Sequence, residues 1–327
     1  MNQSLLKACI YSVLLATVVG CSTQTNRSHR DAPRGVIGVS LLTLENPFFK
    51  VIGDTIVEEG LQEGYKTFLV SADKDAAKQG NQVKDFLVNK VAAIVLSPCD
   101  SKSIVPVIRE ANESGVPVFT VDIPCNEPGV IIATQVATDN LGGGREAGRA
   151  MIEMLGDDGG NVAILHFKQA ESCQLRVQGF REVIEAHNNS GGPTIKIMTE
   201  LESGAAKDGG AKAMDDAMQA FPDIRGVFAI NDPAALGARA AIEKAGKTDQ
   251  IRIIGFDGQP EGKQAIRDGK IYADPIQFPD RMGKEIVQAI VRYSRGEVLP
   301  EKTLIPATLY RKADAERDPT LSGGETR

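Results

Sequence analysis

The sequence contains no tryptophan, and aromatic residues make up only 5% of its 327 positions. A pair of phenylalanines in a loop therefore carries more information than it would in an average chain. An excess of positive charge is missing too: 37 Lys and Arg stand against 43 Asp and Glu, for a formal net charge of −6. This balance argues against nucleic acid or an anionic membrane surface as the main partner.

Signatures of catalysis and metal binding are also missing. His29, His166 and His187 are far apart and accompany no cysteine pair at the spacing of metal ligands. No Gly-x-Ser-x-Gly segment occurs. Residues 246–248 (Gly-Lys-Thr) resemble the end of a phosphate-binding loop, but the earlier glycine is replaced by Ala241. We therefore expect no enzyme activity, no metal and no cofactor.

One apolar run lies near the N-terminus. It extends from Ala8 to Val19, follows Lys7, and is too short to cross a bilayer as a permanent helix. Residues 18–21 (Val-Val-Gly-Cys) resemble a bacterial lipobox, whose cysteine receives a lipid. We expect residues 1–20 to be a lipoprotein signal peptide, Cys21 to be lipidated, and the polar residues 21–34 to form a flexible tether. The alternative is an ordinary secretory signal with an incidental cysteine.

Length and periodicity predict two α/β lobes. After the signal is removed about 300 residues remain, more than one hydrophobic core usually serves. Short β-branched runs alternate with helical patterns, which predicts parallel sheets. We expect strands at residues 36–40, 66–71, 92–96, 117–121, 162–166, 194–198, 226–230 and 252–256, and a first helix at residues 47–63. Two later helices should each bury one apolar face: Ala147, Ala150, Met151 and Met154 in one, and Met282, Ile286, Ala289 and Ile290 in the other.

Polar and aromatic side chains follow the carboxyl ends of these strands. In an open parallel sheet, ligands bind beyond those ends. Aromatic rings cover the C–H faces of a sugar, while carboxylate, amide and guanidinium groups bond its hydroxyls. The sequence therefore predicts a site for a small polar solute between the lobes.

Several segments together resemble the ribose-binding family of periplasmic sugar-binding proteins. They are residues 43–49 (Thr-Leu-Glu-Asn-Pro-Phe-Phe), 138–140 (Thr-Asp-Asn), 228–232 (Phe-Ala-Ile-Asn-Asp), 255–258 (Gly-Phe-Asp-Gly) and 277–280 (Gln-Phe-Pro-Asp). The resemblance covers nearly all of residues 35–310. It implies a type I periplasmic binding fold, in which two doubly wound parallel-sheet lobes are joined by a three-segment hinge, here near Thr138, Gln277 and Leu304.

On this resemblance, residues 35–138 and 278–303 form the N-terminal lobe, and residues 139–277 and 304–313 form the C-terminal lobe. Residues 314–327 are expected to be a disordered tail.

The resemblance also implies the ligand contacts: Asn46, Phe48, Phe49, Asp122, Arg176, Asn231, Phe256, Asp257 and Gln277. The phenylalanines would form walls, and the polar side chains would bond hydroxyls. Two positions depart from the family pattern. Ile123 stands where the family often has Arg, and a frequent aromatic is replaced around Ala205. A ribose pocket is therefore not implied, and a solute of different shape, or with fewer hydroxyls at one end, is expected.

Other roles for these residues remain open. Asp122 and Asp257 suit helix N-caps, one of Phe48 and Phe49 suits a hydrophobic contact that anchors a helix start, and Arg176 suits a surface ion pair. The run of glycines at 142–144 suits an anion cradle or, as we expect, close helix packing near the hinge.

Cysteine usage suggests one disulfide. Without Cys9 and Cys21, three cysteines remain, and Cys99 and Cys125 follow strands expected to be neighbours. We hypothesise a bridge between these two in an oxidising compartment. The alternative is three buried free thiols.

The function that the resemblance implies is capture of a monosaccharide by lobe closure, as the extracytoplasmic component of an ABC sugar importer. The partners would be a membrane permease with a separate ATPase, and the protein would be a monomer anchored through Cys21 in the periplasm or cell envelope. The alternative is a sugar or metabolite sensor that signals to a chemoreceptor or kinase. A repressor is disfavoured, because no basic helix-turn-helix precedes the first strand.

Overall fold

Two six-stranded sheets organise the computed structural model, which describes residues 34–321. The first sheet has the order β11-β5-β4-β3-β1-β2 and consists of β1 (Gly35–Leu41), β2 (Tyr65–Ser71), β3 (Ala93–Leu96), β4 (Val118–Val121), β5 (Gln135–Thr138) and β11 (Lys302–Ile305). The second has the order β12-β10-β9-β8-β6-β7 and consists of β6 (Gly160–His166), β7 (Ile195–Glu202), β8 (Ile224–Ala229), β9 (Arg252–Ile254), β10 (Ala273–Ile276) and β12 (Thr308–Arg311). Among the described strands, β12 runs antiparallel to β10 and the other paired strands are parallel.

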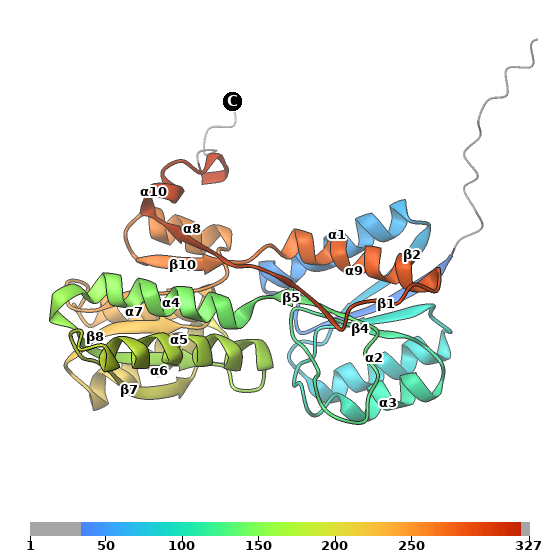
Figure 1. Ribbon diagram of the computed structural model, residues 1–327, viewed down its shortest axis with the longest axis horizontal. Coiled ribbons are helices and arrows are strands. Elements are labelled where there is room, and N and C mark those ends of the chain that lie inside the picture. Colours follow the sequence, from blue (N-terminus) through green and yellow to red (C-terminus); the bar gives the residue numbers. More distant parts are fainter. Residues whose placement is uncertain (1–33, 322–327) are drawn as a thin grey trace, which may run out of the picture.

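Helices cover both faces of each sheet (Figure 1). The helices of the first lobe are α1 (Pro47–Gln62), α2 (Ala76–Val88), α3 (Val105–Glu113) and α9 (Pro279–Ser294). The helices of the second lobe are α4 (Asn140–Leu155), α5 (Glu171–Asn189), α6 (Lys207–Ala220), α7 (Asp232–Lys244), α8 (Pro260–Arg267), α10 (Lys312–Ala315), and the 3-10 turns η1 (Gly156–Asp158) and η2 (Pro319–Leu321). Helices α1 and α9 pack together, as do α2 with α3, α4 with α5, and α6 with α7.

The period-two pattern of the strands explains this layering. In β6, Val162 and Ile164 join one apolar cluster while Ala163 and Leu165 join another, on the opposite face. Both faces are therefore apolar, as parallel strands covered on both sides require. The sequence prediction of a doubly wound α/β fold is confirmed, and the apolar faces expected on α4 and α9 are buried.

The chain passes between the two sheets three times, after β5, after β10 and after β11 (Figure 1). Leu304 was expected at the third passage. Leu304 itself pairs with Ala137 inside the first sheet, so the passage lies just after Ile305, close to the expected place. A short strand that forms by pairing with residues far away in the sequence leaves little pattern in its own residues.

The expected tail from residue 314 is also wrong as far as Leu321. Residues 312–315 form α10, and η2 follows. Asp318 accepts hydrogen bonds from Lys263 Nζ at 3.1 Å and from the Tyr310 hydroxyl at 2.9 Å, so polar contacts fasten this segment to the second lobe.

Helices α4 and α5 approach so closely that only glycine fits at their crossing. A Cβ on Gly144 would lie 2.1 Å from the backbone oxygen of Arg176. Of the glycines at 142–144, Gly144 therefore serves the expected packing of α4 against α5, and this packing sets the position of Arg176.

Contacts between the lobes show a closed arrangement. Lys74 Nζ of the first lobe donates to the Gly204 oxygen of the second at 3.1 Å. Asn126 Nδ2 donates to Glu171 Oε1 at 2.5 Å. The space between the carboxyl ends of the two sheets is therefore enclosed.

Candidate functional site

A small cavity of about 40 Å³ lies between the lobes, at the carboxyl ends of both sheets. The first lobe contributes Leu42, Thr43, Asn46, Phe48, Phe49, Lys74, Asp122 and Ile123. The second contributes Phe167, Ala170, Ser172, Cys173, Arg176, Ala205, Asn231 and Asp257, and Gln277 comes from the second passage. All of the predicted ligand residues except Phe256 line this cavity.

A buried ion pair lies at the second-lobe side of the cavity. Arg176 Nη1 is 3.1 Å from Asp257 Oδ1, and both side chains are nearly inaccessible to solvent. Arg176 also donates from Nε to Asn140 Oδ1 and from Nη1 to the Ile230 oxygen, each at 2.7 Å. Burial raises the pKa of Asp257, and the Arg176 charge opposes that rise. The surface ion-pair interpretation of Arg176 is therefore wrong.

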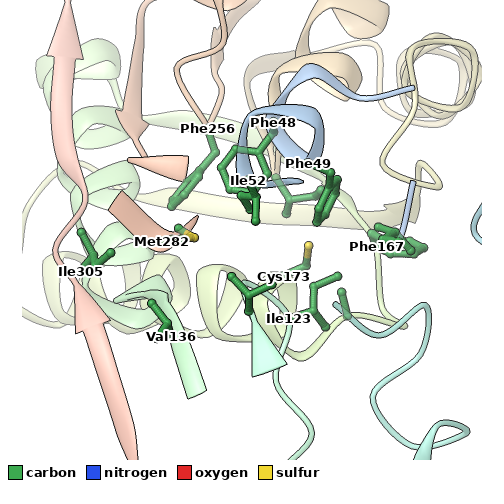
Figure 2. Packing of buried hydrophobic residues seen from close by; sticks show 14 of the residues in the cluster. Phe48, Phe49, Ile52, Ile123, Val136, Phe167, Cys173, Phe256, Met282 and Ile305 are labelled. Atoms are coloured by element: carbon green, nitrogen blue, oxygen red, sulfur yellow. The ribbon is translucent and has the colours of Figure 1, made fainter. Parts of the chain in front are cut away.

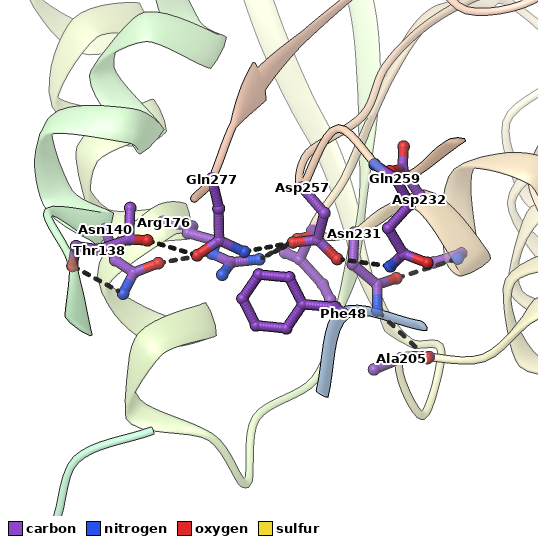
Figure 3. A network of polar contacts seen from close by, with 12 residues as sticks. Phe48, Thr138, Asn140, Arg176, Ala205, Asn231, Asp232, Asp257, Gln259 and Gln277 are labelled. Atoms are coloured by element: carbon purple, nitrogen blue, oxygen red, sulfur yellow. Dashed lines mark hydrogen bonds and ion pairs between the residues drawn. The ribbon is translucent and has the colours of Figure 1, made fainter. Parts of the chain in front are cut away.

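Gln277 connects this ion pair to the hinge (Figure 3). Its Nε2 donates to Asp257 Oδ1 at 2.6 Å, and its Oε1 accepts from the Thr138 hydroxyl at 2.6 Å. Asn140 Nδ2 donates to the backbone oxygen of Thr138 at 3.1 Å. Two of the passages between the lobes thus share one hydrogen-bond network with the cavity.

Asp122 faces the same space from the first lobe without a partner. Its Oδ1 is buried and has no hydrogen-bond partner among the described residues. Burial raises its pKa to about 7, with Arg176 opposing the rise and Asp257 adding to it. A buried carboxyl group without partners is unfavourable unless something else bonds it.

Backbone conformation supports a specialised site. Asp122, Ala205 and Asp257 have φ angles of 63°, 51° and 104°. Non-glycine residues in this region carry strain, which persists at binding and catalytic sites where the surroundings impose it.

Two asparagines that line the cavity cap helices, whereas the two aspartates that line it do not. Asn46 accepts from the Phe48 N–H at 2.9 Å and caps α1, and Asn231 accepts from the Ala234 N–H at 3.0 Å and caps α7. Neither Asp122 nor Asp257 caps a described helix. The carboxylates of Asp122 and Asp257 therefore do not cap a helix in the described part of the chain.

The aromatic pair at the start of α1 serves both core and cavity. Phe48 and Phe49 meet edge to face with centroids 5.3 Å apart, belong to the main apolar cluster, and line the cavity.

Phe256 does not line the cavity, so its expected role as a ligand wall is corrected. Its side chain is fully buried, and its ring lies under the Arg176 guanidinium at 3.9 Å. This cation–π contact helps to hold the Arg176 guanidinium in position.

The hypothesised disulfide is absent. Cys99 and Cys125 are separate buried free thiols. Cys99 packs in the cluster that contains Phe49 and Ile123, whereas Cys125 packs with Ile104 and Val107 in another. Although their strands are neighbours, the two side chains join different cores.

Two further carboxyl groups are buried behind the cavity. Asp232 accepts from the Gln259 N–H at 2.6 Å, and Gln259 Nε2 reaches Asp257 Oδ2 at 3.1 Å. Burial is the main reason that the pKa of Asp232 and of Asp274 is raised, to about 6 for Asp274, and the Asp274 charge raises that of Asp232 further. Two buried neighbouring carboxyl groups repel each other when both are charged, which favours a proton on one of them.

Sequence reasoning missed part of the lining, most of it apolar: Leu42, Thr43, Lys74, Phe167, Ala170, Ser172 and Cys173. Phe167 directly follows a correctly expected strand, so the rule that ligands meet strand ends would have found it.

A second pocket, of about 520 Å³, lies elsewhere on the second lobe. Its lining includes Arg252, Ile271 and Tyr272, at or before the amino ends of β9 and β10. It is therefore at the opposite edge of the sheet from the strand ends that carry Asp257 and Gln277.

Between residues 34 and 321, no three His, Cys, Asp or Glu side chains are grouped to hold a metal ion. Every helix in that part of the chain is too short or too polar to span a bilayer.

Two lobes that enclose a polar, partly aromatic cavity beside a three-passage hinge define the class of two-lobe solute-binding proteins. Residues 37–297 match the model of the periplasmic binding protein domain family. The chain belongs to this family.

Known relatives align with this chain along nearly its whole length. The ribose import binding protein of Bacillus subtilis is 31% identical over 306 residues, 92% of this chain and 96% of that protein. The D-apiose import binding protein of Actinobacillus succinogenes is 31% identical over 289 residues, 88% of this chain and 91% of that protein. An ABC transporter solute-binding protein from Mycobacterium smegmatis, crystallised with glycerol, superposes with a TM-score of 0.80 at 30% identity, covering 88% of this chain and 96% of that one.

Proposed function

We propose that this protein is the solute-binding component of an ABC sugar importer, and that it captures one monosaccharide between its lobes without transforming it. The observation behind the proposal is Asp122 Oδ1, which is buried without a hydrogen-bond partner among the described residues, in a cavity that both lobes build and that the Arg176–Asp257 pair also lines. A hydroxyl that donates to Asp122 would satisfy it, and charge-assisted hydrogen bonds are the stronger kind.

The ligand residues we propose are Asn46, Phe48, Phe49, Asp122, Arg176, Asn231, Asp257 and Gln277, which line one cavity. The relatives are named as import binding proteins for ribose and apiose, which supports uptake over sensing. A volume of about 40 Å³ excludes an oligosaccharide in this closed arrangement.

The proposal extends to partners and location. When the lobes close, their outer surfaces would take up one fixed relative position. A membrane permease that works with a separate ATPase would recognise this closed form. The protein would act as a monomer outside the cytoplasm, held to a membrane by a lipid on Cys21. Residues 1–20 and Cys21 lie outside the described residues, and the motif alone supports the anchor.

A thermal-shift screen of the chain from Ser22 against pentoses, hexoses, sugar alcohols and other small metabolites tests the binding proposal. A ligand at a hundredfold its Kd adds about 2.7 kcal/mol of stability. We expect a hit that Asp122→Asn weakens and that Arg181→Ala, on an exposed part of α5, leaves unchanged. A hit among non-sugar metabolites alone would refute the substrate class.

The anchor has its own test. Full-length protein expressed in a bacterium should fractionate with membranes, and Cys21→Ala should release or mislocalise it. Equal fractionation of the two proteins would refute lipidation at Cys21.

A further inference from the structure

The cavity has two chemically different ends, and strand order creates them. Asn231, Asp257 and Gln277 follow β8, β9 and β10, which are consecutive in the second sheet. Phe167 follows β6, the next strand beyond β8. Hydrogen-bonding side chains therefore gather along one part of the cavity, and an aromatic side chain marks the other.

The first lobe continues this division. Ile123, which lines the cavity, is buried in the same apolar cluster as Phe167 and Cys173. Figure 2 shows Ile123, Cys173 and Phe49 around one region of the cluster, away from Phe256 and Met282. The first-lobe residue that follows Asp122 thus extends the apolar end.

The side chains that pack at this end are mostly apolar, and Lys74, which also lines the cavity, already donates to the Gly204 oxygen. The polar groups beside these side chains are the Ser172 hydroxyl and the Cys173 thiol. Thiols are weak hydrogen-bond partners, and Ile123, Phe167 and Ala170 offer only apolar side chains. A ligand hydroxyl packed against Ile123, Phe167 and Ala170 would lose its water contacts and find no partner on these three side chains.

The polar end has unused capacity. Asp122 Oδ1 has no hydrogen-bond partner among residues 34–321, and Arg176 uses Nε and Nη1 for its protein contacts. A ligand can therefore bond its hydroxyls at this end while its other end stays dry.

We infer that the solute is a small polyol with one hydroxyl-free carbon end, such as the methyl end of a deoxy sugar. The hydroxyls bond Asp122, Arg176 and Asp257, and the apolar end packs against Ile123 and Phe167. This inference rests on the proposed function, since it specifies the sugar that the same cavity takes.

Matched ligand pairs that differ by one hydroxyl test the inference: D-fucose with D-galactose, L-rhamnose with L-mannose, and propylene glycol with glycerol. Calorimetry should show that the deoxy member of the binding pair is tighter by roughly tenfold or more, because a site that cannot bond a buried hydroxyl disfavours it. A tighter or equal hydroxyl-bearing member would overturn the inference while leaving sugar binding intact. If no member of any pair binds but another sugar in the wider screen does, the inference alone fails; if no sugar binds at all, the proposed function fails with it.

A matched pair of variants checks the location. Ile123→Thr adds a hydroxyl at the apolar end, and it should move the affinity ratio of the pair toward one. Val121→Thr adds a hydroxyl to the fully buried strand β4 without lining the cavity, and it should lower stability while leaving the ratio unchanged. An unchanged ratio in Ile123→Thr, with the protein folded, would also overturn the inference.

Discussion

The Thr138 hydroxyl donates to Gln277 Oε1 across 2.6 Å and so joins the first and second passages between the lobes. The same glutamine donates from Nε2 to Asp257 in the cavity. One side chain therefore touches both the hinge and the charge pair, and ligand bonds to Asp257 bear directly on lobe closure.

Gln277→Leu should weaken ligand binding about 10- to 100-fold, because a hydrogen bond to a buried charged group contributes about 1.5–3 kcal/mol. Calorimetric titration measures the loss. Gln288→Leu, which removes an exposed glutamine from α9, is the control and should bind normally. Normal binding by Gln277→Leu would show that the network does not contribute.

Arg176→Ala should lower the free energy of unfolding by about 3–5 kcal/mol, because it leaves the buried Asp257 charge without its cation. Urea denaturation measures this difference. Arg181→Ala, five positions along α5, removes an arginine whose side chain is 40% exposed, and should change stability by less than about 1 kcal/mol. Similar losses in both variants would contradict the role of the buried pair.

Ligand binding should strengthen as pH rises toward 7. The pKa of Asp122 is raised to about 7 by burial, so the empty protein holds a proton there, and its stability falls as pH rises from about 4 through 7. Ligand hydroxyls that donate to Asp122 favour the ionised form, so binding releases this proton below neutral pH.

Calorimetry in two buffers of different ionisation enthalpy should detect the released proton. Asp122→Asn should abolish the release and the pH dependence. Proton release that persists in Asp122→Asn would assign it to another group.

Asp232 and Asp274 should make the protein less stable at alkaline pH. Burial raises the pKa of both carboxyls above the unfolded value, to about 6 for Asp274. Their contribution to stability is therefore complete below about pH 4 and is lost as pH rises through 6 and beyond, by at most ~1.4 kcal/mol per pH unit for each proton.

Urea denaturation between pH 4 and 9 measures this slope, and Asp274→Asn, which supplies a permanent neutral group, should flatten it. Asp268→Asn, an exposed aspartate in the turn before β10, is the control and should leave the slope unchanged. A slope that persists in Asp274→Asn would remove the pair as its origin.

The sequence predicted the alternating strands and the buried faces of α4 and α9 from local periodicity, and the family resemblance supplied eight of the residues that line the cavity. It could not predict β5, β10, β11 and β12, which have four residues each and form through long-range pairing. The confirmed predictions concern features that a short stretch of sequence encodes by itself.

The sequence also could not predict the direction in which individual side chains point. Phe256 and Asp257 are neighbours in a recognised segment, yet one ring lies beneath Arg176 and the next carboxylate faces the cavity. Cys99 and Cys125 likewise follow neighbouring strands but enter different cores. Such choices depend on the packing of both lobes and not on the segment that carries the residue.

The most direct test is a crystal structure of the chain from Ser22 grown with the tightest ligand from the screen. We expect one sugar between the lobes, with hydroxyls within hydrogen-bond distance of Asp122, Arg176 and Asp257. A ligand in the pocket beside Arg252 and Tyr272, with the interlobe cavity empty, would contradict it.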